Sequence, residues 1–245
     1  MTLDIQIASD LHLEYNKIDN YTDIIKPSAP ILVLAGDIGN LYEYIKLQKF
    51  LQWCCDNFIV VIFIPGNHEY YIPYKYSPQY KYELNFNLQK INHIIPNLYI
   101  LNRGCIEIND IYFIGCTLWT NYTEKYLPKY IVKIKNYNKY IYNREHYKDL
   151  NYINKALQLK KKCVIITHHP PIDTIQNPKK KKFTSLYYNK LDYVIKTNPH
   201  ILMWICGHTH KNFDTMVNNT RVVTNQFGKS YENITDYKNN FVISL

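Results

Sequence analysis

Short runs of apolar and β-branched residues, bounded by turn residues, recur along the 245-residue chain. Runs of this kind are typical of buried strands. We predict strands at residues 3–8, 31–34, 59–64, 111–114, 164–167, 201–205 and 221–224. Longer segments with a helical pattern lie between several of these runs, at residues 41–57, 79–94, 140–160 and 185–196.

Strands that alternate with helices favour an α/β fold in which helices cover the faces of the sheets. We expect a four-layer αββα sandwich, with two mixed β-sheets flanked by helices. No internal repeat and no linker interrupts the pattern, so we predict one domain over residues 1–245. Residues 117–138 and 170–184 match neither pattern, and we expect them to form loops that rim the functional site.

The composition narrows the class of protein. With 47% hydrophobic and 20% charged residues, the chain can build a large core and lies outside the disordered class. The N-terminal MTLDIQIASD lacks the pattern of a signal peptide, and the longest aliphatic run, residues 58–64, is far shorter than the roughly 20 residues of a membrane span. We therefore expect a cytoplasmic protein, whose six cysteines are reduced and mostly packed.

The chain is basic, with a formal net charge of +9 and a pI near 9.0. Anionic partners fit this charge, and both small phosphate compounds and nucleic acid qualify. The sharpest local feature is the run of four lysines at residues 179–182. Charge runs are usually solvated or belong to interaction tails, and we favour a solvated loop here.

Metal-binding residue types follow directly where five of the apolar runs end. IQIAS leads into Asp10 and His12, ILVLA into Asp37, VVIFIP into Asn67 and His68, CVIIT into His168 and His169, and ILMWIC into His208 and His210. Parallel strands bring their carboxyl ends to one edge of a sheet, where ligand sites form. We therefore expect the five strand ends to converge on one place.

The donor types at these strand ends suit a divalent metal of the first transition row. Carboxylate, imidazole and amide oxygen bind such ions well, and alternate residues such as Asp10 and His12 point the same way from an extended chain. Glycines precede Asp37, Asn67 and His208 and allow sharp exits from a strand and a close approach of the backbone to bound phosphate. Each motif alone is weak, because Asp and His are common in turns, but all five together indicate a metal site.

In this order, DLH, GDIGN, GNHE, THH and GHTH resemble the full signature of calcineurin-like metallophosphoesterases, from Asp10 to His210. The segments GCTLWT (residues 115–120) and NQFGKSYEN (residues 225–233) also resemble a subgroup of small members. In that subgroup a proline often follows the asparagine, where this chain has Gln226.

The resemblance implies two divalent metal ions, from among Mn, Fe, Zn, Ni, Co and Mg, with Mn favoured. It assigns Asp10, His12 and His210 to the first ion, Asn67, His168 and His208 to the second, and Asp37 as a bridge between them. His68 would lie beside the pair without ligating and would stabilise the transferring phosphoryl group or protonate the leaving oxygen. Asp37 and His68 are thus the catalytic candidates, and His169 is expected at the rim.

The predicted function is metal-dependent hydrolysis of a small phosphodiester or phosphomonoester. Two ions about 3.5–4 Å apart lower the pKa of a bridging water toward roughly 7, and the resulting hydroxide would attack phosphorus in line. A nuclease acting on DNA or RNA is an alternative that the basic charge motivates, although no accessory binding domain remains. A non-catalytic protein-binding scaffold would be expected to have lost some of these ligands. No membrane contact and no obligate protein partner is indicated.

Several further residues near the motifs have open roles. Asn40 could face the substrate or serve the turn after Asp37. Glu69 is a candidate to orient a metal ligand. Tyr70, Tyr71 and Trp119 could form an aromatic wall for the substrate, but in a chain with 25 tyrosines we favour ordinary packing.

Overall fold

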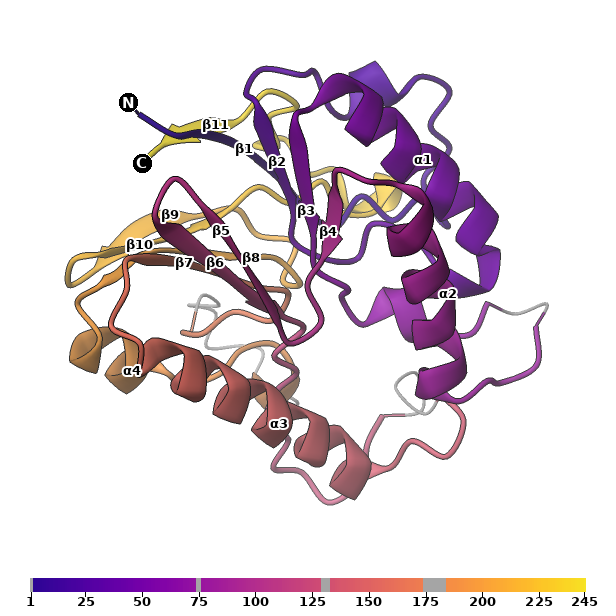
Figure 1. Cartoon of the computed structure of the whole chain (residues 1–245). Helices are drawn as coiled ribbons and strands as arrows, with labels where there is room; N and C mark the ends of the chain where they lie inside the picture. The colour runs from indigo at the N-terminus through magenta and orange to yellow at the C-terminus, as the bar shows by residue number, and fades with distance from the viewer. Residues whose placement is uncertain (1, 74–75, 129–132, 174–183) are drawn as a thin grey trace.

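The computed structural model describes residues 2–73, 76–128, 133–173 and 184–245, which contain two β-sheets (Figure 1). The first sheet has the strand order β11-β1-β2-β3-β4. Its strands are β1 (Asp4–Ala8), β2 (Ile31–Leu34), β3 (Val60–Phe63), β4 (Leu98–Ile100) and β11 (Val242–Ser244). Strands β1 to β4 run parallel, and β11 pairs antiparallel with β1, so that the two termini lie side by side.

The second sheet has the strand order β5-β6-β7-β8-β10-β9. Its strands are β5 (Gly104–Ile108), β6 (Ile111–Cys116), β7 (Cys163–Thr167), β8 (Ile201–Cys206), β9 (Asp214–Val217) and β10 (Thr220–Thr224). The four inner strands are parallel, whereas β5 and β9 pair antiparallel at the two edges. Both sheets are therefore mixed, as the sequence predicted.

Helices cover the outer face of each sheet (Figure 1). Helices α1 (Tyr44–Asn57) and α2 (Lys81–Ile94) pack against the first sheet, and α3 (Lys139–Leu157) and α4 (Asp192–Thr197) pack against the second. The start of α3 is set by Asn138, whose side chain accepts the N–H of Ile141 at 3.0 Å, as expected of a helix N-cap. The four-layer αββα arrangement is confirmed.

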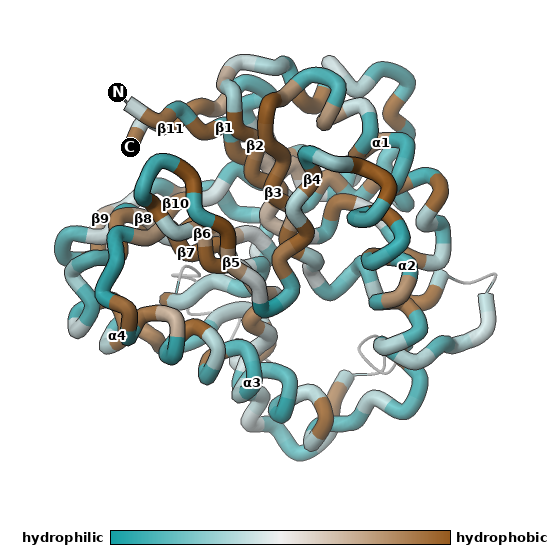
Figure 2. Tube along the Cα trace, viewed as in Figure 1, coloured by the Kyte–Doolittle hydropathy of each residue, from teal (hydrophilic) through white to brown (hydrophobic). Residues whose placement is uncertain are grey.

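Strand β2 is apolar on both faces because each face meets another layer. Along β2, Ile31 and Val33 point into the core between the sheets, whereas Leu32 and Leu34 point toward the helices. In Figure 2 strands β2 and β3 are hydrophobic along their length, while the helices are only partly hydrophobic. This arrangement explains why the strands read as continuous apolar runs and not as alternating ones.

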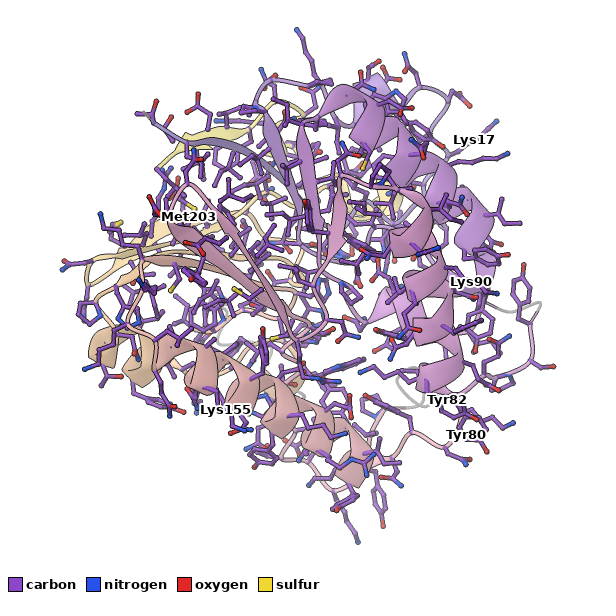
Figure 3. All side chains as sticks on the ribbon, viewed as in Figure 1. Lys17, Tyr80, Tyr82, Lys90, Lys155 and Met203 are labelled. Atoms are coloured by element: carbon purple, nitrogen blue, oxygen red, sulfur yellow. The ribbon has the colours of Figure 1, made fainter. Side chains whose placement is uncertain are left out.

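Side chains at the surface contrast with this core. Figure 3 marks Lys17, Lys90 and Lys155 on the outside of the molecule, where all three are exposed. Met203, also marked there, is buried between the two sheets. No helix in the described ranges is both long and apolar enough to cross a membrane. The cysteines are all free thiols, and all except Cys105 are buried.

Only the last part of the predicted helix at residues 185–196 forms an α-helix. The structure has a short 3-10 turn at Thr184–Leu186 and then α4 at Asp192–Thr197. Between them, the backbone N–H groups of Asn189 and Leu191 donate to the carbonyls of Pro170 and Pro171, at 2.9 and 2.8 Å. These tertiary bonds replace the intrahelical ones, so the segment crosses the loop at residues 170–171 instead of coiling. The lysine run at 179–182 lies outside the described residues.

Candidate metal centre

The residues that follow β1, β2, β3, β7 and β8 meet at one edge of the two sheets, as the strand order predicts. A first group is formed by Asp10, His12 and His210. The Nε2 atom of His210 lies 3.3 Å from Asp10 Oδ1 and 3.0 Å from His12 Nε2. These residues come from opposite ends of the sequence, and the two sheets bring them together.

A second group is formed around Asp37, His168 and His208. His168 Nε2 lies 3.2 Å from Asp37 Oδ2 and 3.0 Å from Asn67 Oδ1. Asp37 Oδ2 is also 3.9 Å from His12 Nε2 in the first group. The structure thus brings together all seven residues expected to bind metal, with Asp37 between the two groups.

The hydrogen bonds of the histidines determine which ring nitrogen faces the centre. The Nδ1 atoms of His12, His168 and His210 face oxygen acceptors: Glu14 at 3.1 Å, the carbonyl of Ala35 at 3.0 Å and Glu232 at 2.5 Å. In His208 the two ring nitrogens have exchanged roles. Its Nε2 lies 3.0 Å from the carbonyl oxygen of Leu186, so Nδ1 is the nitrogen left for a metal. A ring nitrogen that donates to such an oxygen leaves the other one of a neutral ring unprotonated and able to bind a metal.

This arrangement leaves acceptor atoms facing one another. With Nδ1 protonated and the rings neutral, the Nε2 atoms of His12 and His210, 3.0 Å apart, cannot donate to each other. Likewise His168 Nε2 faces two oxygens, on Asp37 and Asn67. Convergent lone pairs of nitrogen and oxygen are stabilised by a cation between them. Each of the two groups of donors therefore fits a divalent metal ion.

Electrostatics keeps the central carboxylate ionised. Burial raises the pKa of Asp37, but the nearby histidines, His168 first, lower it further, to well below its ordinary value. Burial lowers the pKa of His208 far below its usual range, so that this ring is neutral and available as a ligand. A neutral imidazole next to an ionised carboxylate is the protonation state that metal binding requires.

Two glycines are needed because the carboxylates come very close to the backbone. A Cβ atom at position 66 would lie 2.3 Å from Asp37 Oδ1, and one at position 207 would lie 2.5 Å from Asp10 Oδ2. Both distances are impossible for a real side chain. The glycines of GNHE and GHTH therefore make room for the two aspartates, where the sequence had suggested a phosphate.

The backbone is strained at the centre. Non-glycine residues with positive φ include Asp10 (55°), His12 (45°), Asp37 (54°), His208 (75°) and His210 (52°). Such conformations are costly outside glycine and persist where surrounding contacts enforce them, commonly at functional sites. Most of the candidate ligands are thus held in place by the fold and are not free to relax.

Glu69 and Asn40 connect the loops that carry the ligands. The buried carboxylate of Glu69 accepts four backbone N–H groups, from Asp37, Ile38, Gly39 and Gly66, at 2.7–3.2 Å. Asn40 donates to the carbonyls of His68 and Tyr71 at 2.9 and 2.5 Å, and its side-chain oxygen caps the turn at Tyr42. Glu69 supports Asp37 as the sequence suggested, and Asn40 serves the turn.

A cavity of ≈ 380 Å³ opens beside the centre. Besides Asp37, Asn67, His208 and His210, it is lined by His68, by Lys133 and Lys229, and by the rings of Tyr15, Tyr71 and Tyr187. Lys133 comes from the loop at residues 117–138, so that loop does border the site. Tyr70 and Trp119 are fully buried, as the packing interpretation expected, whereas Tyr71 reaches the cavity.

His169 is not at the rim. It is 1% exposed, its Nδ1 lies 3.2 Å from the carbonyl of Thr117, and its ring lies 4.0 Å from that of His208 between centroids. β7 extends through Thr167 into a turn in which both histidines are buried, so His169 lines the cavity from a buried position and not from an exposed rim. His169 packs against the ring of His208 and supports it.

The sequence interpretation missed three polar residues that contact the histidines. Glu14 and Glu232 accept from Nδ1 of His12 and His210, and the buried Gln226 accepts the backbone N–H of His210 at 2.7 Å. Glu14 continues the alternation of Asp10 and His12 in DLHLE, and this spacing of two could have revealed it. Gln226 and Glu232 belong to the NQFGKSYEN segment, whose resemblance to small family members suggested no role for either side chain.

Known proteins resemble this chain in sequence and in fold. A family model for calcineurin-like phosphoesterases matches residues 3–212. An uncharacterised protein of Acanthamoeba polyphaga mimivirus is 31% identical over 272 residues, covering 97% of this chain and 93% of the relative.

Among solved structures, a phosphopantetheinyl hydrolase from Mycobacterium tuberculosis aligns over 100% of this chain and 96% of its own, with a TM-score of 0.77 and 15% identity. A dimetal phosphatase from Danio rerio aligns over 91% and 86%, with a TM-score of 0.54 and 14% identity. These structural likenesses concern the fold.

Proposed function

The chain belongs to the calcineurin-like phosphoesterase family, and from that premise we propose that it hydrolyses a phosphate ester with a pair of divalent metal ions. Metal binding and hydrolysis of phosphate esters are properties of the family. The number of ions, the role of each residue and the preference for monoesters or diesters are proposed for this chain. The proposed ions are two, with Mn favoured, and the proposed substrate is a small phosphorylated compound.

The observation that carries the proposal is the convergence of candidate metal donors on both sides of Asp37. His12 Nε2 and His210 Nε2 face each other at 3.0 Å, and His168 Nε2 faces Asp37 Oδ2 at 3.2 Å. Each group brings carboxylate and imidazole donors within 4.8 Å of one another, a donor set that fits a divalent cation. We assign Asp10, His12 and His210 to one ion, Asn67, His168 and His208 to the other, and Asp37 to both.

The side chains of the protein have separate tasks in the proposed reaction. When bound, the ions supply positive charge that activates water and offsets the charge on the phosphoryl oxygens. His68 lines the cavity and is assigned to stabilise the phosphoryl group or to protonate the leaving oxygen. The buried Glu69 holds Asp37 in place through the backbone, which reduces reorganisation during the reaction.

The cavity supports a small substrate over a long one. It measures ≈ 380 Å³ and has tyrosine rings on its walls and two lysines, Lys133 and Lys229, that can bind a further negative group. A nuclease remains the second candidate, because the chain carries a net charge of +9. A protein-binding scaffold is disfavoured, because every proposed ligand is present and oriented.

A substrate panel tests the proposal. Purified protein is incubated with each divalent metal and with bis(p-nitrophenyl) phosphate, p-nitrophenyl phosphate, cyclic nucleotides and single-stranded DNA. Turnover of the small esters that depends on added metal is the expected result. Preferred cleavage of DNA would favour the nuclease, and no turnover of any substrate with any metal would contradict an enzymatic function.

A further inference from the structure

Glu14 contacts two histidines of the site with a single oxygen. Its Oε1 lies 3.1 Å from Nδ1 of His12 and 3.2 Å from Nδ1 of His68. The Glu14 side chain is only 8% exposed, and the His12 side chain is fully buried. These are short, well-shielded contacts, in which a carboxylate bonds more strongly than it does in water.

The carboxylate determines where both rings carry a proton. Its Oε1 faces the Nδ1 atoms of both rings, and because a carboxylate accepts hydrogen bonds, both Nδ1 atoms are expected to donate. Burial raises the pKa of Glu14, but the bonds from His12 and His68 lower it further, to about 2, in agreement with this geometry. The Nε2 atom of each ring then remains available. In His12 this atom faces the first metal group, and in His68 it belongs to a ring that lines the cavity.

The same contacts fix the relative orientation of the two rings. The centroids of His12 and His68 lie 4.6 Å apart with the ring planes at 82°. Tyr15 and Tyr71 flank the His68 ring, at centroid distances of 5.7 and 5.0 Å. Aromatic contacts restrict the position of an imidazole but do not distinguish its two flipped orientations, because only a polar partner tells Nδ1 from the ring carbons.

We propose that Glu14 is a positioning residue that holds His68 with Nε2 toward the substrate. The inference rests on the proposed phosphoesterase function. As the phosphorus–oxygen bond to the leaving group breaks, its electron pair stays on the leaving oxygen, and the proton on His68 Nε2 passes to that oxygen. His68 is then neutral and still donates from Nδ1 to Glu14. The Glu14 carboxylate thereby contacts both the proton donor, His68, and His12, a proposed ligand of the first metal ion.

The alternative role for His68 is that of a metal ligand, and it predicts a different result for the variants. Ligand atoms of His12, Asp37 and His68 all lie within 4.8 Å of one another, so His68 could itself bind metal. In that case Glu14 would orient two ligands and would have no effect on proton transfer. Loss of a metal ion from a His68→Ala variant would therefore overturn the proposal.

The test compares Glu14→Gln, Glu14→Ala, His68→Ala and the double variant Glu14→Gln/His68→Ala, with turnover measured on a good and a poor leaving group. Glu14→Gln keeps an oxygen that can accept both N–H groups, but a neutral amide oxygen accepts more weakly than a carboxylate and holds the His68 ring less firmly. We expect it to keep both metal ions and to lose about tenfold or more only on the poor leaving group. Glu14→Ala should also lower metal affinity by about 10–100-fold, because His12 loses its orienting partner.

The double variant and a matched control separate positioning from general damage. If Glu14 acts through His68, Glu14→Gln/His68→Ala is no slower than His68→Ala alone. If the two losses multiply, the proposal is overturned. Glu232→Gln is the control, because Glu232 contacts the ligand His210 but not His68. Its losses should be equal for both leaving groups.

A readout without turnover makes failure of this inference distinguishable from failure of the proposed function. Nitrogen NMR of the imidazole rings in metal-free protein should show His12 and His68 protonated at Nδ1 in the wild type. In Glu14→Ala at least the His68 ring should lose this preference, and an unchanged tautomer would contradict the inference even if the enzyme is active. If Glu14→Ala fails to fold, the turnover of Glu14→Gln and of the double variant still tests the inference.

Discussion

The two carboxylate oxygens of Asp10 lie 3.0 and 3.1 Å from the backbone nitrogen of His208, a residue 198 positions away in the sequence. Asp10 follows β1 in the first sheet, and His208 follows β8 in the second. The hydroxyl of Ser9 donates to Asp10 Oδ2 at 2.6 Å. Asp10 is therefore both a proposed metal ligand and a link between the two sheets.

Replacing Asp10 by Asn should consequently destabilise the protein even without metal. The amide of Asn presents an NH₂ group where the carboxylate accepts from Ser9 and His208, so one buried donor loses its acceptor. We expect the free energy of unfolding, measured by urea titration in the presence of a chelator, to fall by about 1–3 kcal/mol. Asp19→Asn, at an exposed position, is the control. Equal stability of the two variants would show that the link contributes little.

Asp37→Ala should abolish turnover and reduce the metal content of both groups. Asp37 Oδ2 lies 3.2 Å from His168 Nε2 and 3.9 Å from His12 Nε2, so its removal affects both donor sets. Metal content after gel filtration and turnover on bis(p-nitrophenyl) phosphate are the two measurements. Turnover within tenfold of the wild type would show that Asp37 is not part of the metal centre.

Away from the site, Glu145 should make stability depend on pH. Its Oε2 atom lies 2.8 Å from Lys81 Nζ and 3.5 Å from Arg103 Nη1. Burial raises the pKa of Glu145, but Lys81, Arg103 and Lys148 together lower it to about 2, from 4.5. A lowered carboxyl pKa stabilises the fold above the unfolded value and loses that effect as pH falls.

Glu145→Gln should therefore be less stable than the wild type near pH 7, by an amount on the order of 2 kcal/mol once solvent screening of the ion pairs is allowed for. The difference should shrink as the pH falls from 4.5 toward 2, where the wild-type carboxyl also becomes neutral. Chemical unfolding of both proteins at several pH values measures it. Glu124→Gln, at an exposed position, provides the comparison, and a difference independent of pH would contradict the assignment.

The site was more predictable from the sequence than the edges of the sheets. Strands such as β2 and β3 are buried on both faces, so their apolar runs are continuous, and candidate ligands follow where they end. Strands β4, β5, β9 and β11 were missed because they are short or half-exposed and lack such runs. The hairpin from β5 to β6 did carry a signal: Asn109 and Asp110, both with positive φ, are typical of a two-residue hairpin turn.

Residues that act through long-range contacts were the least predictable. Glu232 and Gln226 reach His210 only because β10 pairs with β8 and brings the C-terminal segment back to the centre. No local pattern around either residue predicts this contact. The reversal of His169, from rim to interior, has the same origin, since burial of a turn depends on which layers cover it.

The lysine run at residues 179–182 tests the nuclease alternative. Neutralising all four lysines should leave the salt dependence of binding to single-stranded DNA unchanged, because we interpret the run as a solvated loop. If the lysines bind DNA phosphates, the slope of log affinity against log salt should instead decrease by up to about 0.9 for each phosphate that the variant no longer neutralises. Binding titrations at several salt concentrations decide between these outcomes.

His68→Ala should separate catalysis from metal binding. The variant keeps Asp10, His12, Asp37, Asn67, His168, His208 and His210, so it should still bind two metal ions. Burial lowers the pKa of His68, and the nearby Asp37 and Glu14 raise it in part. Turnover should fall by roughly 10²- to 10⁴-fold, the usual range for losing a positioned acid or charge stabiliser.

The dependence of this loss on the leaving group identifies what His68 does. A poor leaving group such as an alkoxide needs a proton as it departs, whereas p-nitrophenolate needs little. A larger loss on the poor leaving group therefore assigns His68 as the proton donor, and equal losses assign it as an electrostatic stabiliser of the phosphoryl oxygens. Metal analysis of the same samples is the control, and a missing ion would make His68 a ligand and require the histidines to be reassigned.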